Sequence, residues 1–143
     1  MSWIDERVEQ RRRLAERNKA VGEGAEVLYR DLWEEITAQT KEAQEKSVAV
    51  GTNNGSAHER IVWAPNVASL AQPTNRRELK ISLRKEREQI AISGTEFSMI
   101  LSIDVGEDGV VCLKHNGKPV LIQEAARLIL DQFLFPELQT KKS

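Results

Sequence analysis

The stretch that decides the fold is ELKISLRKEREQIAISGTEFSMILSIDVGEDGVVCLKHNGKPVLI, residues 78–122. Apolar and polar residues alternate along most of it, as in β-strands that bury one face. The longest alternating run covers residues 97–105. Asn116-Gly117 is the strongest short hairpin signal, because a type I′ turn needs positive φ at both central residues. Short connections between the runs predict an antiparallel meander with one apolar and one polar face.

Residues 1–47, upstream of this region, have the pattern of a long charged α-helix. Their apolar residues recur mostly three or four positions apart, which places them on one helix face. Arg11 and Asn18 interrupt this stripe, so its first half is a less continuous apolar surface for packing than its second half. Gly22 and Gly24 each disfavour a helix interior by about 1 kcal/mol relative to Ala, and the sequence leaves open one long helix or two. The stripe consists of Ile4, Val8, Leu14, Ala15, Val21, Ala25, Leu28, Leu32 and Ile36.

Two further segments complete the chain. Residues 48–77 have the composition of a linker and irregular region, with a polar, Gly-containing cluster at 51–56. Within this region, residues 60–63 favour a short strand and residues 67–72 a single helical turn, so it can supply a fifth strand or a lid. Residues 122–136 predict an apolar C-terminal helix that needs cover on most of its sides.

The predicted fold is α+β, with residues 1–143 forming one domain of ordinary size. An antiparallel meander of four to five strands is covered on its apolar face by the C-terminal helix and by residues 25–46 of the N-terminal helix. An unbroken helix over residues 2–46 would be about 68 Å long at 1.5 Å per residue, which is too long for one small domain to cover. This surplus length and the apolar C-terminal helix predict a homodimer.

The composition narrows the classes of function. With 40% apolar and 30% charged residues, the chain has the composition of a soluble globular protein. A formal net charge of −1 and 5% aromatic residues give no general attraction to nucleic acid or anionic lipid. The single cysteine excludes an intramolecular disulfide, and no apolar run approaches the roughly 20 residues of a membrane span. We therefore expect a cytoplasmic protein that does not enter a membrane.

The sequence contains no recognisable catalytic or metal-binding motif. His58 and His115 lie beside turns and lack the spacing of a metal site. The acidic segment 104–109 resembles a calcium loop only superficially, because the twelfth position is His115 rather than Glu. Cys112 lies in an apolar strand, where a thiol is expected to be buried and unreactive. We predict no cofactor, no metal and no catalytic residue, and we favour a protein that is not an enzyme.

Basic residues cluster at the start of the β-rich region. Lys80 and Arg84 alternate with apolar residues of the first strand, so they are expected on the polar outer face of the sheet. Neighbouring glutamates dilute this charge, and we expect no exposed aromatic side chain on that face. Both features argue against nucleic-acid binding. The candidate basic patch consists of Arg76, Arg77, Lys80, Arg84, Lys85 and Arg87.

Three tryptophans stand out in a chain with few aromatic residues. Trp33 lies beside the helix stripe, Trp3 is close to the first residue, and Trp63 shortly precedes Pro65. Trp33 is expected to belong to the core, whereas a tryptophan in the position of Trp3 or Trp63 often anchors a partner or lines a ligand pocket. A cleft between the sheet and the helices would be lined by Trp33, Trp63, Phe97, Met99 and Phe133.

Three functions are compatible with these patterns. The first is a non-enzymatic interaction module, which self-associates or binds another protein through its N-terminal helix or a sheet edge. The second is a carrier or enzyme that holds a small apolar ligand between the sheet and the helices. The third is nucleic-acid binding through the outer basic face, which would weaken steeply as salt rises.

Overall fold

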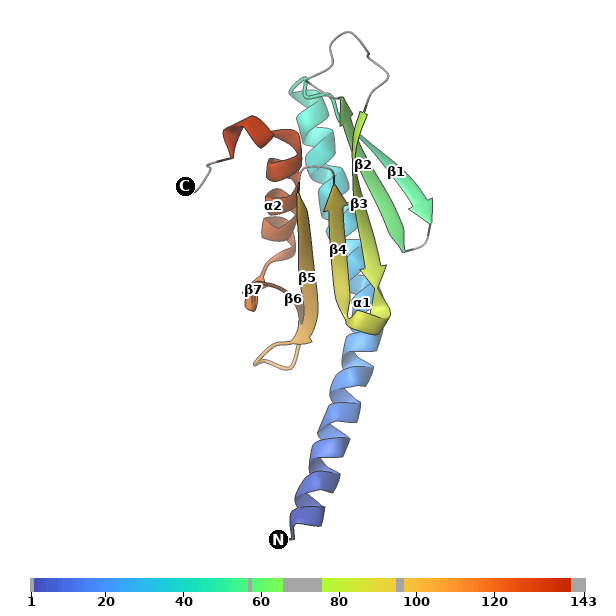
Figure 1. The fold of residues 1–143 in the computed structure, drawn as a ribbon, viewed down its shortest axis with the longest axis vertical. Helices are drawn as coiled ribbons and strands as arrows, with labels where there is room; N and C mark the ends of the chain where they lie inside the picture. The colour runs from blue at the N-terminus through green and yellow to red at the C-terminus, as the bar shows by residue number, and fades with distance from the viewer. Residues whose placement is uncertain (1, 57, 66–75, 95–96, 140–143) are drawn as a thin grey trace.

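A computed structural model describes residues 2–56, 58–65, 76–94 and 97–139 (Figure 1). In these residues a long helix is followed by a seven-stranded antiparallel sheet and a second helix. The strand order follows the chain, so each strand pairs with the next one. The elements are α1 (Trp3–Glu45), β1 (Gly51–Ser56), β2 (Glu59–Pro65), β3 (Arg76–Arg84), β4 (Gln89–Gly94), β5 (Ser98–Val105), β6 (Val111–His115), β7 (Lys118–Val120) and α2 (Ile122–Leu134), with short 3-10 turns at Lys85–Arg87 and Pro136–Leu138.

The N-terminal segment forms one uninterrupted helix, α1. Ser2 caps it, because its hydroxyl accepts a hydrogen bond from a backbone N–H of the first turn at 3.2 Å. The helix continues through Gly22 and Gly24, which decides between the two alternatives that the sequence leaves open. Val21 and Ala25 beside these glycines are buried. Tertiary packing at this point therefore offsets the low helix propensity of glycine.

The sheet has seven strands in the described residues, so the prediction of four to five was too low. Residues 51–56, predicted to be a linker, form the edge strand β1 and pair antiparallel with β2. Gly51 permits this pairing, because a Cβ there would lie 2.2 Å from the indole of Trp63. Residues 59–65 form β2, a full strand between β1 and β3. The helical turn predicted at 67–72 lies outside the described residues.

The predicted alternation sets the two faces of the sheet. Ile81 on β3 pairs with Ile92 on β4, which pairs with Met99 on β5, and all three side chains are buried. The intervening residues point to the opposite face of the sheet. Asn116 and Gly117 have φ angles of 53° and 79°, which confirms the predicted hairpin turn between β6 and β7.

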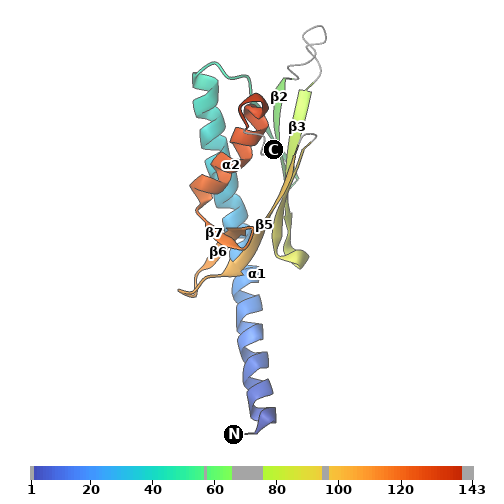
Figure 2. The same ribbon diagram turned by 60° about the vertical axis from the view of Figure 1, so that its left-hand side comes forward.

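Both helices lie on the same face of the sheet and pack against each other (Figure 2). Leu32 and Ile36 of α1, together with Ile129 and Phe133 of α2, form the core against the buried strand residues. This confirms that the C-terminal helix and the second half of the N-terminal helix cover the apolar face. α1 and α2 also contact each other, so α1 covers part of the apolar surface of α2 that the sheet leaves open.

Candidate functional site

The first part of α1 projects beyond the sheet as an N-terminal arm, which we define as residues 3–16 (Figure 1). At 1.5 Å per residue the arm is about 21 Å long. Its residues are exposed except for Glu9, which neighbouring arginines partly cover. Four large apolar side chains of the arm are open to solvent: Trp3 (72% exposed), Ile4 (54%), Val8 (58%) and Leu14 (56%).

One face of the arm pairs its charges internally. Arg12 forms ion pairs with Glu9 and with Glu16, the latter at 2.8 Å, and Arg13 reaches Glu9 at 3.2 Å. The hydrogen bond from Arg12 holds the pKa of the Glu9 carboxyl below its usual range. Ion pairs this exposed add little to stability. They do give this face the character of an ordinary solvated helix surface.

The opposite face of the arm is apolar and contains an arginine. Ile4, Val8 and Ala15 lie on it, with Arg11 between Val8 and Ala15. Arg11 forms no hydrogen bond or ion pair within the described part of the chain. This face continues the stripe whose second half, from Val21 onward, is buried against the sheet. The same pattern is therefore a core-facing surface in one half of the helix and an exposed surface in the other.

Arg17 attaches α1 to the sheet at the point where the arm leaves it. Its guanidinium donates to Glu88 at 2.9 Å and to Asp104 at 3.0 Å. Asp104 also accepts from the Val105 N–H at 2.8 Å and from Lys114 at 3.4 Å. The Val105 N–H and then the Arg17 guanidinium hold the pKa of Asp104 below its usual range, although partial burial opposes them. These contacts fix the direction in which the arm projects.

The Arg17 cluster is a feature that the sequence analysis missed. Arg17 is separated from Glu88 by 71 positions and from Asp104 by 87 positions. No local spacing connects such distant residues, and on the helix Arg17 has the pattern of a solvated side chain. Only the packing of α1 across the ends of β4 and β5 brings the three together.

The five residues predicted to bind a ligand do not line a common cleft. Trp63 lies on the outer face of the sheet, because the residues on either side of it in β2 are buried on the helix side. Met99 and Phe133 are buried in the core beneath the helices, and Phe97 packs half-buried against that core. Trp33 is half-buried on α1. The sheet therefore separates Trp63 from the others.

Trp63 is packed against neighbouring residues on the outer face. Gly51 of the edge strand lies against its indole, and the guanidinium carbon of Arg76 lies 4.8 Å from the ring centroid. Trp63 is therefore an aromatic side chain on this face that is half-buried rather than exposed. The indole over Gly51 stabilises the pairing of an edge strand that has little apolar surface of its own.

Trp33 lines a hollow of about 430 Å³ between α1 and the β1–β2 hairpin. Tyr29 and Arg60 contribute to the same hollow. Arg60 donates to two backbone carbonyls of the hairpin, while its Nε is buried with no hydrogen-bond partner among the described residues. The Tyr29 hydroxyl donates to the Ile81 carbonyl at 2.6 Å, and burial raises its pKa to about 12. The hollow thus combines aromatic surface with an incompletely paired guanidinium.

Arg77 is buried and does not belong to the predicted basic patch. It donates to the Phe133 carbonyl at 2.7 Å, and its guanidinium carbon lies 5.0 Å from the Phe133 ring centroid. This carbonyl belongs to the last turn of α2, whose carbonyls lack partners within the helix. A signal for this placement exists in the sequence, because Arg77 shares the parity of Leu79 and Ile81, which face the core.

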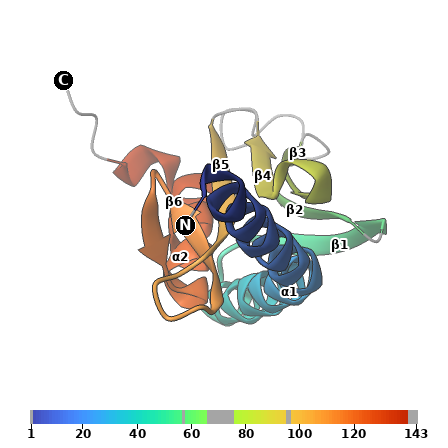
Figure 3. The same cartoon turned by 90° about the horizontal axis from the view of Figure 1, so that it is seen from below.

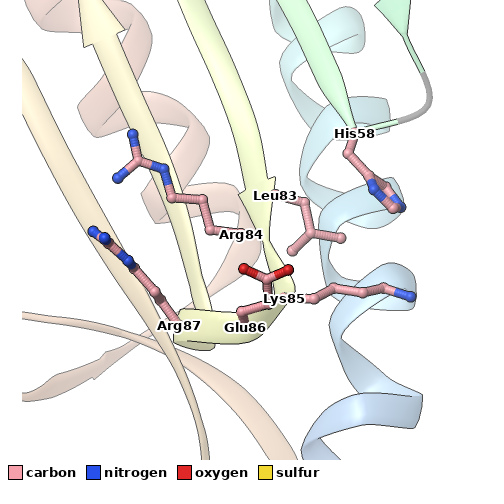
Figure 4. Close-up of a pocket in the computed structure, with 6 residues that line it drawn as sticks. All are labelled: His58, Leu83, Arg84, Lys85, Glu86 and Arg87. Carbon is pink, nitrogen blue, oxygen red and sulfur yellow. The ribbon is translucent and has the colours of Figure 1, made fainter.

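The remaining basic residues point in different directions. Lys85 lies in the β3–β4 turn beside a hollow of about 590 Å³ and points toward α1, where it meets Glu26 at 2.6 Å (Figure 4). His58 contacts the same carboxylate at 3.1 Å, and Lys85 and then His58 hold the pKa of Glu26 below its usual range. Arg84 and Arg87 point away from that pair (Figure 4). The basic side chains therefore do not converge on one anion.

On the outer face, the strand β3 carries the other two residues of the patch. Arg76 is held over Trp63, and Lys80 lies 3.6 Å from Glu59. Each of these cations thus has a partner within the sheet. Arg84 is exposed at the end of the same strand. The outer face presents separate charges rather than the continuous basic surface that nucleic acid requires.

Metal and membrane signals are absent from the part of the chain that the structure describes. No group of three or more His, Cys, Asp or Glu side chains there is placed to hold a metal ion. No helix in the described ranges combines the length and the apolar character needed to cross a bilayer.

Comparison with known proteins gives no family: no family model, curated protein or solved structure matches the chain. The surfaces of the molecule itself are thus the basis for a functional proposal. Of these surfaces, the N-terminal arm carries the largest group of exposed apolar side chains in the described residues.

Proposed function

We propose that this protein is a non-enzymatic interaction module that self-associates through its N-terminal arm. The observation that carries the proposal is the exposure of Ile4, Val8 and Leu14 on a helix segment that the sheet does not cover. Single exposed apolar residues are common, but a group of them along one projecting element marks an interaction surface. Covering this face removes its apolar area from water, which is the main driving force for association.

Pairing would also stabilise the arm as a helix. Isolated helices of about 12–15 residues are marginal in water, because few hydrogen bonds repay the nucleation of the helix. The arm is continuous with the packed part of α1, which removes the nucleation cost at one end. A second copy of the chain has the same apolar face on its arm, and it is available wherever the protein itself is present. Two arms can therefore cover each other in a two-fold symmetric interface.

Val8→Lys tests this proposal. An ammonium group at the centre of the apolar face, beside Arg11, must be desolvated with no counter-charge on that face when the arms pair, so the variant should remain monomeric at concentrations where the natural chain dimerises. Sedimentation velocity over a dilution series measures the mass directly, starting from a monomer of 16.2 kDa. Val27→Lys is the matched control, because Val27 is an exposed valine on the same helix outside the arm.

The natural chain and Val27→Lys should show the same dissociation constant, while Val8→Lys should show no dimer over the concentrations measured. A natural chain that stays at the monomer mass throughout would contradict the proposal. Equal weakening by both lysines would also contradict it, because the effect would then reflect added charge rather than loss of the arm face.

A second candidate function is binding of a small molecule with aromatic and anionic groups in the hollow at Trp33. The observation in its favour is the buried Nε of Arg60, which has no hydrogen-bond partner among the described residues, in a hollow that Tyr29 and Trp33 also line. A ligand acceptor would satisfy this donor, and the Trp33 ring would offer a stacking surface. The hollow lies between α1 and the β1–β2 hairpin, not at the five-residue cleft predicted from the sequence.

Native mass spectrometry tests the second candidate. The purified natural chain should carry an added mass that denaturation releases, and Trp33→Ala should lack it while keeping the same state of association. If the natural chain carries no added mass and takes up none from a library of aromatic carboxylates, this candidate fails. The first candidate is unaffected by that outcome, because the hollow and the arm share no residue.

A further inference from the structure

The arm has the residue spacing of a short coiled-coil seam. Ile4, Val8, Arg11 and Ala15 are four, three and four residues apart, which is the alternation of the two core positions in a heptad. Arg11 is the charged member of this set. A charged residue at such a position selects the orientation of the partner helix, because its neighbour across the seam must tolerate the charge.

A parallel pair of arms places like charges together. In register, Arg11 of one copy would face Arg11 of the other inside the seam. The residues that flank the seam would add a second repulsion between like charges, since Arg7 of one copy would lie beside Arg12 of the other. Two guanidinium groups in a partly dehydrated seam repel each other, and the arm offers no acidic residue on that face.

An antiparallel pair avoids these contacts. With Val8 of one copy opposite Arg11 of the second copy, the aliphatic stem of each arginine covers a valine and its charged end reaches solvent. Ile4 then faces Ala15, a large residue opposite a small one. Asp5 of one copy lies beside Arg12 of the second, so opposite charges flank the seam at both ends. The acidic start and the basic second half of the arm are complementary in this orientation only.

The antiparallel register also places Trp3 of one copy next to the sheet of the second copy. Because the arm is about 21 Å long, Trp3 of one copy reaches the level of Glu16 and Arg17 of the second, where that copy's sheet begins. The turn between β5 and β6 lies at the end of the sheet from which the arm projects (Figure 1), and in the view from below it lies beside α1 (Figure 3). Val110 in that turn is 62% exposed. A seam of only two heptads is short, and contact between Trp3 and Val110 extends it onto the sheet.

We infer that two copies of this chain pair their arms antiparallel, with Val8 opposite Arg11 and Trp3 against the β5–β6 turn of the other copy. The inference rests on the proposed self-association and specifies its geometry. The two sheets then lie at opposite ends of an elongated dimer, and their outer faces and edges stay open.

Disulfide trapping tests the orientation. In a Cys112→Ser background, a chain with Val8→Cys is mixed with an isotope-labelled chain with Arg11→Cys, oxidised mildly and analysed by non-reducing mass spectrometry. A disulfide requires Cα atoms within about 7 Å. The antiparallel register therefore predicts mixed disulfides between the two chains in large excess over disulfides between identical chains. Val27→Cys, outside the arm, is the control and should form no specific disulfide.

Each other outcome is informative. Disulfides between identical chains in excess would overturn the antiparallel orientation while leaving self-association through the arm intact. A dimer by sedimentation that forms neither disulfide would overturn both the orientation and the arm as the interface. The absence of any dimer would show that the proposed function itself is wrong.

Trp3→Ala tests the contact with the turn separately. It should raise the dissociation constant of the dimer about tenfold, because tryptophan is enriched among the few interface residues that carry most of the binding energy. Val110→Lys should weaken the dimer in the same direction. An unchanged constant in both variants would overturn the Trp3 contact, even if the disulfides support the antiparallel seam.

Discussion

Tyr29 joins helix α1 to the sheet through one hydrogen bond and is the only tyrosine of the chain. Its hydroxyl donates to the Ile81 carbonyl at 2.6 Å, and burial raises its pKa to about 12, above the usual value of about 10. The neutral form is therefore favoured by folding. Its contribution to stability is complete below about pH 10 and is lost as the pH rises through about 12.

A spectrophotometric titration of the phenol tests this prediction, because a single tyrosine gives the whole signal. In the native protein the ionisation midpoint should lie near 12, and in concentrated urea it should return to about 10. Circular dichroism over the same pH range verifies that the protein is still folded. A native midpoint near 10 would mean that Tyr29 is open to water and that α1 does not pack on β3 as described.

Other single residues show what sequence can and cannot reveal. Arg77 has the parity of core positions in β3, so its inward placement was accessible from alternation alone, but its charge led to a surface prediction. Arg17 gave no such signal, because its partners Glu88 and Asp104 are close only in the folded chain. Tyr29 directly follows Leu28 of the stripe, so the sequence places it beside the core-facing side of the helix. The identity of its hydrogen-bond partner, the Ile81 carbonyl, depends on which strand lies beneath the helix.

At the scale of elements, α1 contains two glycines in different surroundings. A Cβ at Gly22 would meet no atom within 4 Å, whereas at Gly24 it would lie 3.1 Å from the Val111 side chain. Gly22→Ala should therefore raise the free energy of unfolding by about 1 kcal/mol, through higher helix propensity alone. Gly24→Ala should give a smaller gain or a loss, because Val111 has to move to accommodate the methyl group.

Urea unfolding at one protein concentration, followed by circular dichroism, measures both changes. Equal gains at the two positions would contradict the described packing of α1 against β6. A loss of stability at Gly22 would contradict the continuity of the helix through that residue.

The elements themselves were predicted with uneven success, for identifiable reasons. Alternation and the Asn116-Gly117 turn were sufficient for the strands between residues 78 and 120, because each carries its own pattern. The edge strand at 51–56 escaped prediction, because five of its six residues are Gly, Asn or Ser, which are typical of loops. Its pairing depends on Trp63 of β2 lying over Gly51, a contact that local composition does not encode.

At the scale of the whole molecule, the helices cover one face of the sheet and α1 continues past it (Figures 1 and 2). The stripe on α1 has one period from Ile4 to Ile36, yet only its second half meets the sheet. The helical pattern of residues 1–47 was predictable, and so was the excess length that an unbroken helix would have, but the continuity of the helix through Gly22 and Gly24 was not. Where the sheet ends along the helix was not predictable, since this depends on the pairing of all seven strands and on the Arg17 contacts.

Hydrogen–deuterium exchange at two protein concentrations tests most directly whether the arm is the surface of self-association. At a concentration below the dissociation constant, backbone amides of residues 3–16 should exchange quickly, since an uncovered helix segment of this length opens readily. At a concentration well above it, these amides should become protected, while those of the buried strands remain unchanged. Arm amides that exchange at the same rate at both concentrations, in a protein shown to dimerise, would contradict the account.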